Sequence, residues 1–552
     1  MLRALVLSSA VALTFRIAAH QLAPKEQVWA GEAWGAPPPA TPRAVASTHA
    51  ASLTVGGRSA LPNTTVAGHA VPNNTTATAA SKVGSPSMHT PGVPYHTRIF
   101  LSGEPRVSVV ESLPVGDFSL APLPNSTSTA AALIALMDSA VYQLDICAMY
   151  WNLLGLADHA IFSPEQMTKF GADRGVAVFA ALERAIHRGV VVRVIGSSAP
   201  SFAPAELAPL ALTLRLWDSD YWYGGGIMHQ KLVLVDERHA YVGSANMDWK
   251  SLAQVMEVGV LVESSPVVVQ DMQRLFELWW VWADPTSPAQ LPVPVDTFVE
   301  RFQAVLRLPP WSPLVSAAQA TPTPFNATAL ASVFNKDNQM TAMWNGERSL
   351  VFVTAAPDAA TARARTFDED GLIYTIESAK KSICLSVMDF VPFSTFPIDS
   401  HPTGSIYWPA LTDALLAVVF ARPVTIKLLI SHWAHTSVVM VEALKHLEAA
   451  AETCPQVGLK CRGSLQVRLM EVPGWDAAPP TWPPYSRVNH AKYIVTDQRA
   501  NVGTSNMEWG YFYNTAGTSL NTDNTDVMDA LQKIFDRNWD SSYAHPLRAY
   551  YF

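Results

Sequence analysis

The chain has 552 residues, more than one hydrophobic core usually supports, so we expect at least two domains. Hydrophobic residues make up 49% of the sequence and include 17 tryptophans, which is enough for a large packed core. The formal net charge of −8 argues against a broad basic surface that grips duplex DNA, although a narrow cationic groove stays open, and four cysteines are too few for a disulfide-built scaffold.

The first residues are typical of a secretory signal peptide. Arg3 is followed by an apolar run over residues 4–15 and then by small residues at Ala18 and Ala19. That run is shorter than the about 20 residues of a membrane span, so we expect residues 1–19 to be a signal peptide. A mitochondrial presequence and a short uncleaved membrane anchor are the alternatives. The secretory route is favoured by five sequons for N-glycosylation, at Asn63, Asn73, Asn74, Asn125 and Asn326.

Residues 20–94 are rich in Ala, Pro, Thr and Ser and show little hydrophobic periodicity. Such a segment buries too little apolar surface to offset its ordering entropy, so we expect a disordered linker. Periodic sequence begins near Tyr95. We predict an N-terminal lobe over residues 95–310 and a C-terminal lobe over 311–552, with Pro-rich sequence at 291–324 as the crossing between them.

The two lobes repeat one order of predicted elements. In the first, an apolar strand at 144–151 precedes a helix at 176–187 and a β-branched strand at 190–195. The second repeats this order at 383–390, 408–420 and 424–430. Each lobe is therefore expected to be a mixed β-sheet flanked by helices, which makes the fold class α/β with two pseudo-symmetric lobes.

A short motif follows these elements in each lobe. It has the form His-x-Lys-x4-Asp, with four residues between Lys and Asp, followed by Gly-Ser/Thr-x-Asn. The residues are His229, Lys231, Asp236, Ser244 and Asn246 in the first copy and His490, Lys492, Asp497, Thr504 and Asn506 in the second. A lone His-x-Lys is usually a solvated strand face. Two copies 261 residues apart, with His-to-Gly offsets of 14 and 13, indicate a duplicated catalytic domain.

The residue types in the two copies suit the chemistry of a phosphodiester. Side chains two apart on a strand share a face, so the His and Lys of each copy point the same way. If the copies meet, two ammonium groups and two amides can neutralise the non-bridging oxygens of one phosphate. One histidine can then attack phosphorus and form a phosphohistidine, while the other protonates the leaving oxygen. No set of side chains has metal-ligand spacing, so we predict a phosphodiesterase that needs no metal or other cofactor.

One acidic residue breaks the symmetry of the two copies. Glu257 follows the first motif, whereas the matching stretch 514–518 contains no acid. A carboxylate on the Nδ1–H of His229 would fix the tautomer of that ring and make its Nε2 a better nucleophile. We therefore expect Glu257 to contact His229, with His229 as the nucleophile and His490 as the general acid.

The remaining residues of interest have structural interpretations beside functional ones. Hairpin turns are the expected place of the motif aspartates, and we assign supporting roles to Asp236, Ser244, Asp497 and Thr504. A disulfide between Cys454 and Cys461 is an even alternative to free thiols. Four aromatic residues either stack on nucleobases or pack in the core, and packing is favoured: Tyr150, Trp151, Trp222 and Tyr223.

The duplicated His-x-Lys-x4-Asp pattern resembles that of the phospholipase D superfamily. Longer strings resemble its animal endolysosomal branch, phospholipases D3 and D4, and include residues 243–252, 428–433, 487–490 and 538–543. This resemblance covers about residues 109–547. It implies a 5′→3′ exonuclease that degrades single-stranded DNA and RNA to 3′-phosphomononucleotides in the lysosome, with lipid transphosphatidylation as the alternative. The active site that it implies consists of His229, Lys231, Asn246, His490, Lys492 and Asn506.

Three departures from that branch bear on the expected substrate and location. The N-terminal apolar run is short for the membrane anchor of those relatives, Asp497 stands where they have Glu, and residues 507–509 replace their Trp-Ser. We expect an endolysosomal or secreted protein, cleaved or anchored at its N-terminus. Its substrate is single-stranded nucleic acid or, alternatively, a phospholipid. The sequence does not decide whether the protein forms a homodimer, whether it acts as an exo- or an endonuclease, or whether it prefers DNA or RNA.

Overall fold

The computed structural model describes residues 99–124, 126–198, 202, 204–219, 226–285, 330–361, 364–394, 406–456, 463–478 and 480–550. The expected signal peptide, the linker, the five sequons, the Pro-rich crossing and the lobe boundary at 310 lie outside these residues. So do Trp222, Tyr223, Cys461 and the side chain of Cys454. Within the described ranges, no helix is both long and apolar enough to cross a bilayer.

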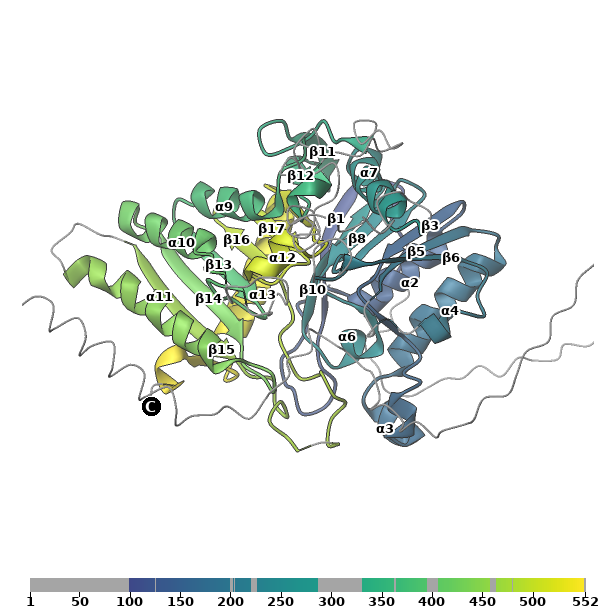
Figure 1. Ribbon diagram of the computed structural model, residues 1–552, viewed down its shortest axis with the longest axis horizontal. Helices are drawn as coiled ribbons and strands as arrows, with labels where there is room; N and C mark the ends of the chain where they lie inside the picture. The colour runs from purple at the N-terminus through teal and green to yellow at the C-terminus, as the bar shows by residue number, and fades with distance from the viewer. Residues whose placement is uncertain are drawn as a thin grey trace, which may run out of the picture. The chain divides into compact units, whose positions relative to one another are not determined.

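The N-terminal lobe is built on an eight-stranded mixed sheet with the order β2-β1-β10-β8-β7-β3-β5-β6 (Figure 1). Its strands are β1 Arg106–Ser112, β2 Thr127–Ser128, β3 Gln143–Cys147, β5 Val191–Ser197, β6 Thr213–Trp217, β7 Leu232–Val235, β8 His239–Gly243 and β10 Glu257–Glu263. The neighbours β3, β5 and β6 run parallel, while β7, β8, β10 and β1 form antiparallel pairs. A short parallel ladder joins β4 Trp151–Asn152 to β9 Met247–Asp248.

The helices of this lobe are α2 Thr129–Ser139, α3 Pro164–Lys169, α4 Asp173–His187, α6 Trp249–Ala253 and α7 Pro266–Trp282. The face of α4 that carries Val178, Leu182 and Ala185 is buried, because these residues recur at helical spacing. Helix α4 packs on α2, which covers β1, β7, β8 and β10. The predicted helix at 176–187 is confirmed and begins three residues earlier, at Asp173.

The C-terminal lobe repeats this plan with a nine-stranded sheet of order β11-β12-β18-β17-β16-β13-β14-β15-β19. Its strands are β11 Met340–Trp344, β12 Glu347–Val353, β13 Ser382–Val387, β14 Thr425–Ser431, β15 Ser464–Met470, β16 Tyr493–Thr496, β17 Ala500–Gly503, β18 Ser519–Thr522 and β19 Ala544–Pro546. Its helices are α9 Asp368–Ser378, α10 Ala410–Ala421, α11 Val438–Gln456, α12 Trp509–Tyr513 and α13 Thr525–Trp539. Short 3-10 turns lie at Asp158–Ala160, Pro204–Glu206, Asp358–Thr361 and Leu547–Tyr550.

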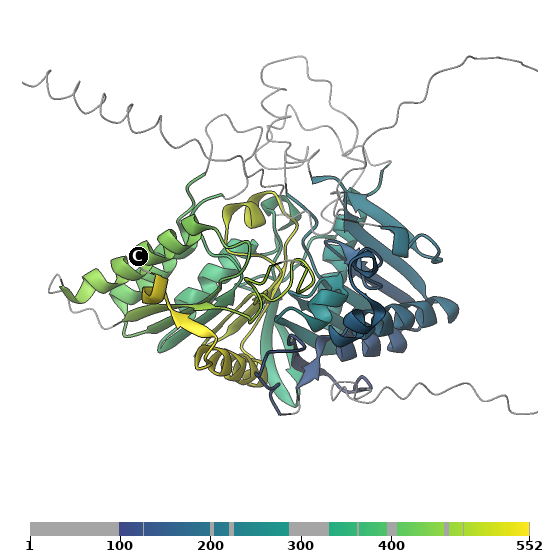
Figure 2. The same cartoon turned by 90° about the horizontal axis from the view of Figure 1, so that it is seen from below.

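The two sheets share one hydrophobic core. Strands β8 and β10 of the first sheet contact β17, and β8 also contacts β18. Buried Val242 and Val260 belong to the same apolar cluster as Val502 and Leu520. Figure 2 shows the helices at residues 410–456 and those at 129–187 on opposite outer sides of the paired sheets. The predicted α/β fold with two pseudo-symmetric lobes is confirmed. The apolar face that each sheet turns toward the other is buried by the contact between the two sheets.

Candidate active site

The motif residues of the two lobes are buried at the interface between the sheets. Each His-x-Lys immediately precedes a central strand, β7 or β16, and each Asn follows the returning strand, β8 or β17. Their relative exposures are His229 0%, Lys231 3%, Asn246 1%, His490 1%, Lys492 2% and Asn506 0%. Burial of two lysines at one place is unusual, because removing a charge from water is costly unless a partner compensates it.

Each histidine segment is hydrogen-bonded to the opposite lobe. The N–H of His229 donates to Ala516 O at 3.0 Å, and Ala516 N–H donates to the carbonyl two residues before His229 at 2.9 Å. The same pair of bonds joins His490 to Met256, at 2.8 and 2.9 Å. The backbone therefore fixes each histidine against the partner lobe, and the two half-sites are brought together by these bonds.

The carboxylate of Glu257 contacts the second histidine. Nδ1–H of His490 donates to its two oxygens at 2.9 and 3.0 Å. The expectation that Glu257 contacts His229 is wrong, because Glu257 directly follows Met256 and is carried across the interface by the backbone pairing.

The matching position beside His229 is Gly517, which follows Ala516 and has no side chain. A Cβ there would come closer to Ser505 Oγ than van der Waals contact allows, so a side chain at position 517 would require Ser505 to move. Glu257 lies on the ring of His490, and the reason for which the sequence favoured His229 as the nucleophile therefore no longer holds.

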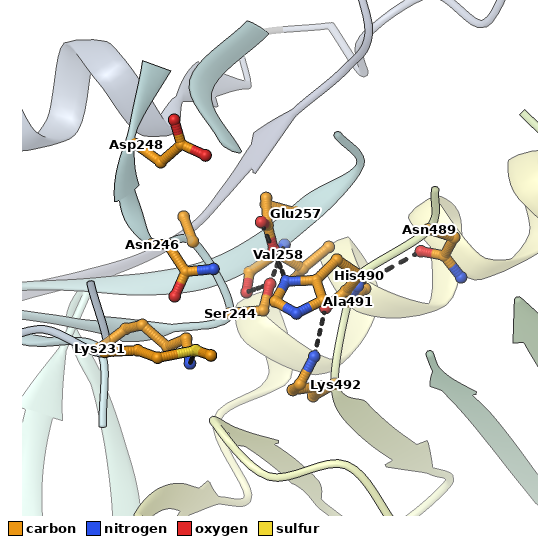
Figure 3. Close-up of polar contacts among 12 residues, drawn as sticks. Lys231, Ser244, Asn246, Asp248, Glu257, Val258, Asn489, His490, Ala491 and Lys492 are labelled. Carbon is orange, nitrogen blue, oxygen red and sulfur yellow. Dashed lines mark hydrogen bonds and ion pairs between the residues drawn. The ribbon is translucent and has the colours of Figure 1, made fainter. Parts of the chain in front are cut away.

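Charges from both lobes act on the His490 ring. Burial lowers the pKa of His490 below its usual value, the negative charge of Glu257 opposes this, and the ammonium groups of Lys492 and Lys231 lower the pKa further. Lys231 comes from the other lobe, so both half-sites influence the charge of this ring. Figure 3 draws Lys231 and Asn246 beside this ring.

Both lysines are tied to the histidine of their own motif. Lys231 Nζ donates to His229 O at 2.9 Å, and Lys492 Nζ donates to His490 O at 3.0 Å. Lys231 Nζ also lies 4.0 Å from Met149 Sδ. These bonds hold each ammonium at the main-chain carbonyl of the histidine two residues before it.

The two asparagines are oriented by different partners. Asn246 Nδ2 donates to Tyr150 Oη at 3.4 Å, and Tyr150 in turn donates to Asp248 Oδ2 at 2.9 Å. Asn506 Nδ2 donates to Asp389 Oδ2 at 3.0 Å and to Tyr511 Oη at 3.1 Å. Sequence reasoning missed these roles. Their only sequence signal is position, because Tyr150 and Asp389 occupy the same place after the first strand of each repeat.

Two neighbours of these asparagines affect the site further. The ring of Tyr511 meets that of His229 edge-on, with 4.9 Å between their centres. Burial raises the pKa of Asp248 to about 6, with Lys250 opposing the rise and Asp158 adding to it. Tyr150 and Trp151 are 2% and 1% exposed, so the favoured core interpretation of these two aromatics is confirmed.

The motif aspartates lie at the far ends of the central strands. Asp236 accepts the N–H groups of residues 141–143, each at 2.8 Å. Asp497 accepts those of residues 380–382, at 2.9, 2.9 and 3.3 Å. Ser244 and Thr504 each bridge to the neighbouring strand through the N–H and carbonyl of one residue. These contacts are structural, and they tie the hairpin to the rest of its sheet.

We expect Asp497→Asn to lower stability and leave turnover nearly unchanged. Burial alone would raise the pKa of Asp497, but the N–H groups that it accepts hold the pKa below its usual value. A depressed carboxyl pKa stabilises the fold above about pH 3.9 and ceases to do so as the pH falls through the folded value. Because the group is only partly buried and solvent screens its charge, the loss should be only about 1 kcal/mol. Denaturant unfolding near neutral pH and near pH ~3 measures it, and an equal loss at both would contradict the charge-based explanation.

Among the described residues, no three His, Cys, Asp or Glu side chains are grouped so that they could hold a metal ion. Cys147 and Cys384 are free and buried.

Comparisons with known proteins find one family in both lobes. A family model described as "Cardiolipin synthase, PLD-like domain" matches residues 133–280, and one described as "PLD3/4, PLD-like domain" matches residues 314–474. The chain is 33% identical over 447 residues to phospholipase D Y of Dictyostelium discoideum, covering 80% of this chain and 92% of that protein. It is 32% identical to the 5′-3′ exonuclease PLD3 of Bos taurus and 31% identical to that of Homo sapiens, covering 80% of each chain.

Proposed function

Because the chain belongs to the phospholipase D superfamily of phosphodiesterases, we propose that it is a 5′→3′ exonuclease of single-stranded DNA and RNA that acts through a covalent phosphohistidine. The observation that carries this proposal is the meeting of two complete His/Lys/Asn sets at one buried interface. Relatives that cover 80% of the chain and bear the name 5′-3′ exonuclease support the nucleic-acid substrate.

The first chemical step needs one neutral and one protonated histidine. A carboxylate stabilises the protonated form of a neighbouring imidazole, so Glu257 makes His490 the better general acid. His229 lies beside Gly517 and the edge of Tyr511, and we assign to it the role of the neutral nucleophile. Its Nε2 attacks the phosphorus on the 3′ side of the first nucleoside. The bond to the 5′ oxygen of the next nucleotide breaks, and His490 protonates that oxygen.

The second step releases the bound nucleotide. His490, now neutral, takes a proton from water, and the resulting hydroxide attacks phosphorus and breaks the bond to His229. The product is a 3′-phosphomononucleotide, and the remaining strand carries a new 5′-hydroxyl. In both steps Lys231, Lys492 and the two motif asparagines stabilise the negative charge on the non-bridging oxygens.

The burial of the site favours a thin substrate. All six motif side chains are at most 3% exposed, so a single strand reaches them more readily than a duplex. The net charge of −8 also disfavours broad binding of a duplex backbone. The alternative function is that of a phospholipase D or transphosphatidylase, with the same residues and an alcohol in place of water. The relative named phospholipase D Y supports this alternative.

One paired assay separates the two substrates. We expect degradation of single-stranded oligonucleotides with a free 5′-hydroxyl and protection of those with a blocked 5′ end, without release of choline from phosphatidylcholine. Choline release at a comparable rate would favour the lipid alternative. Cleavage of both oligonucleotides would contradict exonucleolytic action.

Activity should survive a chelator, because two lysines supply the positive charge that a metal supplies in other phosphodiesterases. Loss of turnover in EDTA, restored by added divalent metal, would overturn the two-lysine mechanism. The lowered pKa of His490 fits an acidic compartment, since the general acid must be protonated there. We therefore place the protein in the endolysosomal lumen, and localisation of the tagged full-length chain tests this placement.

A further inference from the structure

An aromatic cluster is formed by loop residues that follow the parallel strands β14 and β15. The rings of His435 and Tyr485 stack with 4.8 Å between their centres and 15° between their planes. Trp433 meets His435 edge-on at 4.7 Å and is 5% exposed. His435 is exposed and Tyr485 is partly buried, so the stack has a buried base and an outer ring that reaches solvent.

Short connections limit how far this cluster can lie from the motif residues. Trp433 packs in the same apolar cluster as Met149 and Tyr150, which touch Lys231 and Asn246 respectively. The other ring, Tyr485, packs against that cluster and precedes His490 by five residues, which is at most ~18 Å of extended chain.

A second connection comes from β14. Ser431, its last residue, donates from Oγ to the carbonyl of Asn489, the residue before His490. His435 follows Ser431 by four residues, at most ~14 Å of extended chain. Both rings of the stack are thus tied to the segment that carries His490.

The cluster is held rigidly from both sides. A turn fixes the His435 side, because Trp433 N–H donates to Thr436 Oγ1 at 2.8 Å and Thr436 N–H donates to Trp433 O at 2.9 Å. Tyr485 has a left-handed backbone, with φ 58°, and so does Arg487, with φ 57°.

The buried guanidinium of Arg487 holds the second side. It donates to Pro473 O at 2.6 Å, to Val115 O at 3.0 Å and to Gly116 O at 3.2 Å. These bonds fasten the loop of Tyr485 to both lobes, which pre-organises the stack instead of leaving it to form on binding.

From this geometry we propose that His435 and Tyr485 form a stacking platform for an unpaired nucleobase next to the scissile phosphodiester. The inference rests on the nucleic-acid function proposed above. A parallel pair of rings presents one flat outer face, which suits the planar ring of a base. A quaternary ammonium headgroup instead favours several rings around a cage. Although part of the His435 ring is open to solvent, packing against its aromatic neighbours partly desolvates it, which lowers its pKa and keeps the ring uncharged to lower pH.

Substrates without a base test the platform. We would compare kcat/KM for a short single strand with that for strands bearing an abasic residue at the first or second position from the 5′ end. In the wild-type protein, an abasic residue at one of these positions should lower kcat/KM roughly 5- to 100-fold, which is the usual effect of losing a base stacked on an aromatic ring. His435→Ala should lose most of that factor on the intact strand and nothing on the abasic strand.

Two further variants serve as controls for the effect of His435→Ala. Tyr485→Phe keeps the ring and should behave as wild type, and the unfolding midpoint of each variant checks its fold. Tyr142→Ala removes an aromatic side chain that is 75% exposed near the start of β3, and it should leave discrimination against the abasic strand unchanged.

The possible results distinguish failure of the stacking platform from failure of the proposed exonuclease function. If the ratio of kcat/KM on intact and abasic strands is the same for His435→Ala as for the wild-type protein, the stacking proposal is wrong, and the proposed exonuclease function is unaffected. If the wild-type protein turns over phosphatidylcholine and leaves single strands intact, the proposed function fails and the platform fails with it.

Discussion

Replacing either His229 or His490 by alanine is expected to lower kcat/KM on a single-stranded oligonucleotide by roughly 10⁴-fold or more. Each residue is needed in both steps, since one carries the covalent bond and the other transfers the proton. The double variant should be little worse than either single variant, because residues that act as a unit lose their effect together. Steady-state rates of the three variants test this non-additivity.

An activated ester distinguishes the two roles. A nucleoside 3′-(p-nitrophenyl phosphate) has a leaving group that needs no protonation. His490→Ala should release one burst of nitrophenol per protein molecule and accumulate the covalent nucleotide on His229, because the second step lacks its base. His229→Ala should give no burst. A burst from His229→Ala together with none from His490→Ala would reverse the assignment.

The second large effect is expected from Glu257→Gln, at roughly 10²-fold or more in kcat/KM. The carboxylate holds the Nδ1–H tautomer of His490 and raises the pKa of that ring against the effects of burial, Lys492 and Lys231. Without the negative charge, the pKa of His490 falls further. The alkaline limb of the kcat/KM profile reports loss of the protonated acid, so this limb should move to lower pH.

The limb of the kcat/KM pH profile that moves in Glu257→Gln shows whether His490 acts as the acid or as the nucleophile. If His490 were the nucleophile, Glu257→Gln would move the acidic limb, where a nucleophile is lost by protonation. Glu206→Gln is a matched control, because Glu206 is 5% exposed and its carboxylate accepts the N–H groups of Leu153 and Leu154. The control should leave the limbs in place, and a movement equal to that of Glu257→Gln would show a general effect of altered buried charge.

Local patterns in the sequence predicted most of the elements that carry the site. The apolar spacing of Val178, Leu182 and Ala185 is a property of one segment, so the helix at 173–187 could be recognised without the rest of the fold. The strand expected at 144–151 is divided in the structure into β3 at 143–147 and β4 at 151–152. The chain leaves the main sheet there so that β4 pairs with β9, and no local pattern encodes that partner.

The supporting role of the motif aspartates was also predictable, because the turn lies within the motif itself. Strand parity and turn chemistry separated Asp236 and Asp497 from the His-Lys pair. Their three N–H donors come from residues about 95 and 117 positions away, which the sequence could not indicate.

Duplication of the motif, its residue types and the single unmatched acid were determined by the sequence itself. These features are local, because hydrogen-bonding capacity, charge and strand alternation depend only on individual residues and their near neighbours. They can therefore be predicted without knowledge of the tertiary structure. Tertiary structure alone decided which histidine receives Glu257, which groups orient the two asparagines, and that His435 stacks on Tyr485. The contact of Glu257 depends on backbone pairing between the lobes, where residues more than 200 positions apart become neighbours because two apolar sheet faces exclude water together. The asparagine partners and the ring stack are assembled within a single lobe, from segments that lie apart in the sequence.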